Sequence, residues 1–91
     1  NYFEINSIMR TFRKVKAFGT TSAGATGGRT NEGILLVCGG AATTVTVYSY
    51  DTTGSTSPVG PISLVANQSF IYPITAYGWT AGNTVTGYEL F

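Results

Sequence analysis

The sequence is short of charge, of cysteine and of histidine. Only 10% of its 91 residues are charged, against about 25% in an average soluble domain. The chain has one cysteine and no histidine, so it can form no internal disulfide, and its thiol has no imidazole base to activate it. A weakly charged surface is typical of proteins that pack against neighbours. We therefore expect this chain to work within an assembly.

The acidic residues are equally sparse: Glu4, Glu32, Asp51 and Glu89. Asp51 and Glu89 would approach each other only if the strands that carry them were neighbours, and Asp51 begins a turn, where aspartate bonds its own backbone. Scattered acids without histidine form no metal-ligand cluster. We predict a non-enzymatic protein with no catalytic residues, no small-molecule substrate, no cofactor and no metal.

Long hydrophobic runs are also missing. No apolar stretch approaches the ~20 residues that a membrane-spanning helix needs, so we expect no membrane partner. Nor is a signal peptide visible, because the first eight residues are not basic and no long apolar segment follows them. The single cysteine, Cys38, lies within a short apolar run, which predicts a buried, inert thiol.

What the sequence does contain is short strand-like runs separated by glycine-rich turns. The stretch from Gly33 to Asp51 holds the apolar run Ile34–Cys38, a Gly-Gly-Ala-Ala turn, and a Val/Thr alternation that reaches Tyr48. β-Branched and aromatic residues in runs too short for helices predict two antiparallel strands joined as a hairpin.

Four more strands follow from the same reasoning. They are an edge strand within 10–20, a strand over 61–66, a strand over 69–77 that bends at or lies beside an edge near Pro73, and a closing strand over 84–91. Turn residues predict loops over 20–33, 51–61 and 78–83. We therefore predict an all-β fold, a small antiparallel β-sandwich or barrel of about six strands. It divides into an N-terminal basic arm or edge strand, residues 1–20, and a single β-domain, residues 21–91.

Positive charge is concentrated near the N-terminus. Arg10, Arg13, Lys14 and Lys16 hold four of the five positive charges within seven residues. Such a cluster can contact an acidic protein surface or nucleic acid, or simply solvate the face of an edge strand. We name these four residues as candidates for partner binding.

Tyrosine and tryptophan are numerous for so small a core. Rings with polar tips that reach the surface commonly anchor interfaces or stack on sugars, although each one alone is explained by core filling. Tyr77 and Trp79 lie in the predicted turn over 78–83 or directly before it. We therefore expect them to form an exposed aromatic cluster that binds a partner.

The order GILL, TVTVYSYD, a Thr/Ser/Gly turn, PISLVANQSFIYP and a closing TVTGYEL, from Gly33 to Phe91, resembles small tailed-phage virion proteins. The resemblance implies a capsid decoration or cement protein that binds the outer shell and stabilises it. The implied partner is the major capsid protein or another virion protein, the implied location is the capsid surface, and the implied state is a homo-oligomer, with a trimer favoured.

Two alternatives stay open. The first is an adhesion or carbohydrate-binding β-module of a phage fibre or spike, which requires Tyr77 and Trp79 to line a groove. The second is a nucleic-acid-binding β-barrel, whose affinity would fall steeply with salt. We do not expect nucleic acid as the partner, since four cations are also explained by a solvated strand face.

Overall fold

The computed structural model describes residues 11–26, 28 and 30–91. Within them the fold is all-β, as predicted, with six antiparallel strands in one sheet. The strands are β1 (Val15–Ala25), β2 (Gly33–Cys38), β3 (Thr43–Tyr50), β4 (Thr56–Leu64), β5 (Ser69–Tyr72) and β6 (Ala76–Leu90). The expected boundary at residue 20 falls inside β1.

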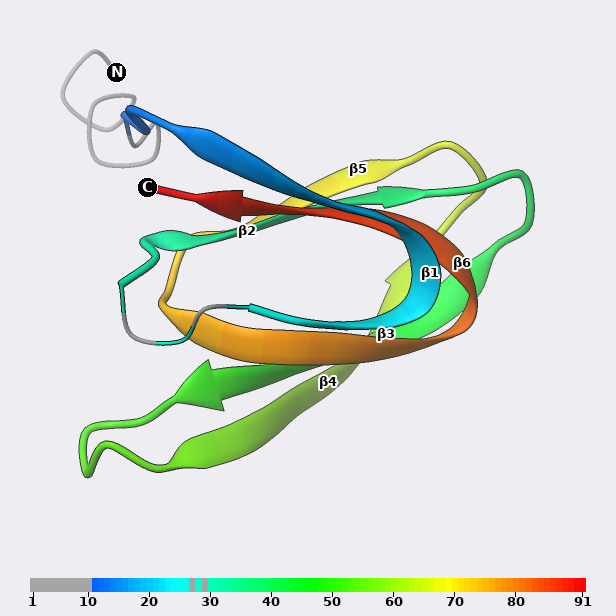
Figure 1. Ribbon diagram of the computed structural model, residues 1–91. Coiled ribbons are helices and arrows are strands. Elements are labelled where there is room, and N and C mark those ends of the chain that lie inside the picture. The colour runs from blue at the N-terminus through cyan, green and yellow to red at the C-terminus, as the bar shows by residue number, and fades with distance from the viewer. Residues whose placement is uncertain (1–10, 27, 29) are drawn as a thin grey trace, which may run out of the picture.

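The long strand β6 organises the sheet. Its first part pairs with β3 and its second part with β2, while β1 follows its other edge. Figure 1 shows β1 and β6 bending together at one end of the molecule, so that β2 and β5 lie in one layer and β3 and β4 in the other. The sheet thus curls over on itself, and its two layers share β1 and β6.

The predicted hairpin from Gly33 to Asp51 is wrong in its pairing. Both strands exist, but β6 lies between them in the strand order β4-β3-β6-β2-β5. The four residues from Gly39 to Ala42 cross from one layer to the other. Asn83, at the bend of β6, holds this crossing: its side chain donates to the carbonyl of Ala42 at 2.9 Å, and its backbone N–H donates to the Thr43 hydroxyl at 3.0 Å.

The predicted turn over 78–83 is also wrong, because β6 continues through it. Gly78 is a packing glycine, since a Cβ there would overlap the carbonyl of Gly24 on β1. Gly82 and Asn83 fall where β6 passes between layers: the β1 partners jump there from Val85 to Thr80. A glycine–asparagine signal therefore marks a bend within one strand.

The predicted loops are shorter than expected. β1 takes up the first part of the loop predicted over 20–33, and β4 begins at Thr56, inside the loop predicted over 51–61. Prolines at 58 and 61 are tolerated because β4 pairs only with β3 and is an edge strand. The single strand predicted over 69–77 is broken at Pro73 into two strands: β5 ends at Tyr72, at the edge of the sheet, and β6 begins at Ala76.

The core lies between the two layers. It contains Ile34, Leu36 and Cys38 from β2, Val45 and Val47 from β3, Trp79 and Val85 from β6, and also Leu64, Tyr72 and Ala76. Cys38 is buried, as predicted, and its thiol donates to the carbonyl of Ala41 at 3.2 Å.

Candidate interaction surfaces

The basic residues of the N-terminal segment lie beside the end of β6. Arg10 is outside the described residues. The backbone N–H groups of Arg13 and Lys14 donate to the carbonyl of Phe91 at 2.5 and 3.2 Å, and the Phe91 N–H donates to the Lys14 carbonyl at 2.9 Å. The side chains of Arg13, Lys14 and Lys16 are all exposed. The sheet therefore fixes the backbone of this segment, while the three charged side chains extend into solvent.

Tyr77 and Trp79 do not form the exposed cluster that we expected. Tyr77 is 49% exposed, but Trp79 is only 1% exposed. The six-membered ring of the indole lies between Gly24 on β1 and Gly87 on β6, and a Cβ on either glycine would overlap it. Phe18 meets the indole edge-on, with ring centroids 5.3 Å apart. Trp79 is buried because two glycines leave room for its ring inside the curled sheet.

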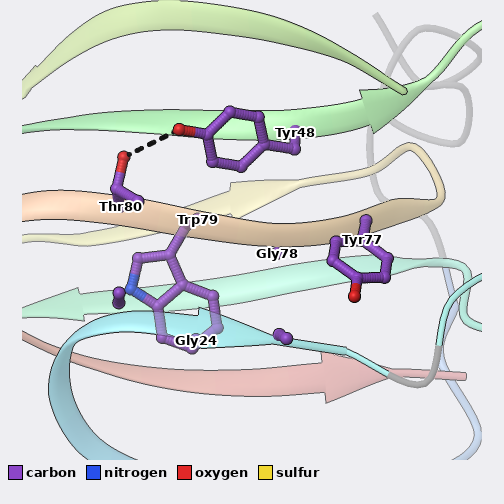
Figure 2. A pocket seen from close by; sticks show the side chains of 8 residues that line it. Gly24, Tyr48, Tyr77, Gly78, Trp79 and Thr80 are labelled. Atoms are coloured by element: carbon purple, nitrogen blue, oxygen red, sulfur yellow. Dashed lines mark hydrogen bonds between the residues drawn. The ribbon is translucent and has the colours of Figure 1, made fainter.

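A shallow groove of about 370 Å³ lies where β1, β6 and β3 run side by side. Figure 2 shows Tyr48 and Tyr77 along it, with Thr80 near the Tyr48 ring. The Tyr48 and Thr80 hydroxyls are hydrogen-bonded at 3.3 Å. The other lining residues are Ala23, Gly24, Ala25, Gly78 and Trp79. A flat, uncharged floor between two tyrosines suits a neutral ring better than an ion.

The layer that contains β2 carries an apolar outer face. Ile34, Leu36 and Cys38 point into the core, so the alternate residues Leu35 and Val37 point outward. Leu35 pairs with Ile71 on one side and with Tyr88 on the other, and Tyr88 pairs with Ala17. Directly paired residues point to the same side of a sheet. We call the following six residues the apolar outer face: Val15, Ala17, Leu35, Val37, Ile71 and Tyr88.

Our sequence prediction missed this face, although a signal for it was present. A strand with one solvated face alternates apolar and polar residues, whereas a strand covered on both faces is apolar throughout. The run Ile34–Cys38 has no polar residue. It therefore indicated a strand that needs cover on both sides.

Asn31 is the centre of a buried polar cluster at one end of the core. Its side-chain N–H groups reach the Gly28 carbonyl at 2.5 Å, the Ala76 carbonyl at 2.9 Å and Oε2 of Glu89 at 3.1 Å. Its Oδ1 accepts from the Ala76 N–H at 3.1 Å, and its backbone carbonyl accepts from the Thr75 hydroxyl at 2.7 Å. The cluster holds Gly28 and Asn31 against both ends of β6.

Asp51 lies apart from this cluster, in the turn between β3 and β4. Its carboxylate accepts hydrogen bonds from the Thr53 hydroxyl at 2.6 Å, the Thr53 N–H at 2.9 Å, and the Ser55 N–H and Ser57 hydroxyl at 3.1 Å each. These bonds, those from Thr53 first, hold the pKa of Asp51 below its ordinary value. Asp51 and Glu89 thus belong to separate hydrogen-bond networks, and the bonds of Asp51 stabilise the turn between β3 and β4.

No family model, no curated protein and no solved structure matches this chain. Within the described ranges 11–26, 28 and 30–91, no group of three or more Cys, Asp or Glu side chains is placed to hold a metal ion. The same part of the chain contains no helix that is long and apolar enough to cross a membrane.

Proposed function

We propose that this chain is a non-enzymatic structural protein of a tailed-phage virion, a decoration or cement protein that binds the outer shell. The observation that carries the proposal is the apolar outer face. Leu35 and Val37 point away from the core, and Ile71 is 51% exposed beside Leu35. A domain with one apolar face inside and a second one outside needs a neighbour to cover the second.

Two features of the sequence support this reading. The low charge content fits a protein that is packed against others, and the pattern from Gly33 to Phe91 resembles small virion β-domains. The mechanism is mechanical: contacts that exist only on the assembled shell stabilise that shell by mass action. The partner is the major capsid protein or another virion protein, and the protein itself associates as an oligomer, with a trimer favoured.

The test is binding to purified empty shells of the phage that encodes the chain. The protein is mixed with shells at increasing concentration, the shells are sedimented, and the bound copies are counted. We expect saturable binding at many copies per shell and a higher temperature of shell disruption. Light scattering on the isolated protein gives its oligomeric state. Shells that retain no protein would overturn the proposal.

The second candidate is a carbohydrate-binding module of a fibre or spike. The groove between Tyr48 and Tyr77 favours it, because its lining is uncharged and tyrosine rings stack on sugar rings. Trp79 is buried and cannot stack. A glycan array would detect such binding, and Tyr77→Ala should then lower the affinity at least tenfold, whereas Tyr50→Ala, outside the groove, should not. An array without any hit, together with saturable shell binding, would remove this candidate.

A further inference from the structure

We propose that a groove beside Asp51 binds the basic segment, residues 13–16, of a second copy of this chain, so that copies join head to tail. The inference deepens the proposed function, on which the place of these copies in a virion rests. It adds which two surfaces of the domain form the oligomer and what chemistry joins them.

The groove lies at the end of the β3–β4 hairpin and has a volume of about 510 Å³. Two exposed apolar side chains line it, Val59 from β4 and Ile74 from the connection between β5 and β6. The N–H of Tyr50, another lining residue, donates to the Thr75 carbonyl at 3.0 Å and so joins the two sides. Ligand pockets span roughly 300–1,000 Å³, so the groove has room for a long side chain.

Asp51 gives this groove a negative charge. Its Oδ1 accepts three hydrogen bonds from its own turn, whereas Oδ2 accepts one, from the hydroxyl of Ser57, which also lines the groove. A carboxylate oxygen can accept more than one donor, so Oδ2 can also accept from an ammonium or a guanidinium. A lysine or arginine side chain combines an apolar stem with a cationic tip. It therefore matches a groove with apolar sides and a carboxylate.

The chain itself carries the matching cations. Within the described residues, all lysines and arginines belong to the basic segment: Arg13, Lys14 and Lys16, each with an exposed side chain. The exposed carboxylates of the same residues are Glu32 and Asp51, and only Asp51 lines the groove. One copy thus presents a cationic segment and an anionic groove. This charge complementarity selects a second copy as the occupant.

The two surfaces lie in different layers of the curled sheet. Backbone hydrogen bonds to Phe91 hold the basic segment beside the end of β6, in the layer that contains β2. The groove belongs to the β3–β4 hairpin, in the other layer (Figure 1). A copy can therefore fill a neighbour's groove while its own groove receives a segment. Such a contact repeats from copy to copy, and it forms a ring where the rotation between copies closes, as a trimer requires.

The experiment measures self-association by light scattering over a concentration series at low salt. Asp51→Asn removes the charge of the groove but keeps an oxygen that accepts from the turn. Glu32→Gln is the matched control, because Glu32 is an exposed carboxylate outside the groove. We expect Asp51→Asn to weaken self-association about fivefold or more, Glu32→Gln less than about twofold, and added salt to weaken that of the wild type. A monomeric wild type, or equal association by both variants, would overturn the inference.

Exchanging the charges tests whether the segment and the groove meet. Lys14→Glu and Asp51→Lys should each weaken self-association, because each places like charges together, and the variant with both substitutions should recover about fivefold or more. Circular dichroism and a melting curve check that each variant folds. Val59→Lys, which puts a cation into the groove outside the turn, replaces Asp51→Lys if that variant does not fold. A folded double variant without recovery would overturn the pairing of this segment with this groove.

Sedimentation of the same variants with purified shells separates this inference from the proposed function. Self-association that depends on Asp51, in a protein that binds no shell, would overturn the function and support the inference. A monomer that binds shells would support the function and overturn the inference. If Asp51→Asn weakened shell binding and left self-association unchanged, the groove would hold basic side chains of a shell protein, and a second copy would be the wrong occupant.

Discussion

The two outward faces of this small domain differ although their strands share the same central neighbour. β3 alternates cleanly, with Val45 and Val47 in the core and Thr44 and Thr46 outside. β2 does not alternate: Ile34 and Leu36 lie in the core, yet Leu35 between them is apolar too. Because both strands pair with β6, the difference does not come from their place in the sheet. The core between the two layers needs one apolar face per strand, and the second apolar face of β2 lies outside that core.

The largest effect is expected from a change that belongs to neither face. Trp79→Ala empties the space between Gly24 and Gly87 and should cost about 3–5 kcal/mol of unfolding free energy, as large core truncations do. Urea denaturation measures it. Tyr77→Ala, one strand position from Gly78 but half-exposed, should change stability by about 0.5 kcal/mol or less. If the two variants were equally stable, the assignment of Trp79 to the core would be wrong.

A smaller loss is expected at the end of the core that contains the Asn31 cluster. Asn31→Ala removes the oxygen that accepts from the Ala76 N–H and the amide that bonds Oε2 of Glu89, while the Ala76 carbonyl keeps its bond from the Thr26 hydroxyl; the loss should cost about 2–3 kcal/mol. The matched control is Asn83→Ala, since Asn83 is exposed and its side chain makes one hydrogen bond, to Ala42. A loss below about 1 kcal/mol is expected there. Equal losses in the two melting experiments would mean that burial of the amide matters little.

The difference between the outward faces of β2 and β3 can be reversed by exchanging their outward residues. Leu35→Thr with Val37→Thr gives β2 the alternation of β3, and Thr44→Val with Thr46→Leu gives β3 the character of β2. We expect each pair to change stability by about 1 kcal/mol, because the residues lie outside the core. Binding of a hydrophobic dye should fall several-fold for the first pair and rise for the second. Unchanged dye fluorescence in both would show that the apolar outer face is not accessible.

The smallest effect concerns the turn that joins β3 to β4. The lowered pKa of Asp51 means that its hydrogen bonds contribute stability above its ordinary pKa of 3.8, and that this contribution is lost as the pH falls below that value toward the lowered pKa. Asp51→Asn should therefore reduce the dependence of stability on pH below about 4. An NMR titration of the Asp51 carboxyl checks the direction, and a pKa above 3.8 would contradict it.

Much of the fold followed from local sequence patterns, because strands depend on local composition. β2 and β3 were predicted from β-branched runs, and a bend or edge position near Pro73 was predicted from the backbone N–H that proline lacks. The pairing of β2 and β3 was not, since the short connection Gly39–Ala42 fits both a hairpin and a crossing between layers. The choice between the two depends on β6. Its residues lie more than 40 positions along the chain from their partners in β2 and more than 25 from their partners in β3.

The candidate surface was predicted less completely, for the same reason. The exposure of Arg13, Lys14 and Lys16 followed from their charge, but their place beside Val15 and Leu90 depends on pairing across the sheet. Trp79 was placed on the surface because Gly78 and Gly82 indicated a turn. Those glycines make room for packing and for a bend instead, and only the register with β1 reveals the space at Gly24 and Gly87.

The position of β6 in the chain also sets the order of events during synthesis. Of the five strand pairings, those of β1, β2 and β3 with β6 all await the last strand of the six to be made. Until then β1 has no partner strand, and only the short β3–β4 and β2–β5 pairs can form. The growing chain therefore keeps the apolar run of β2 without its β6 partner until β6 has been made, and only then can the sheet close.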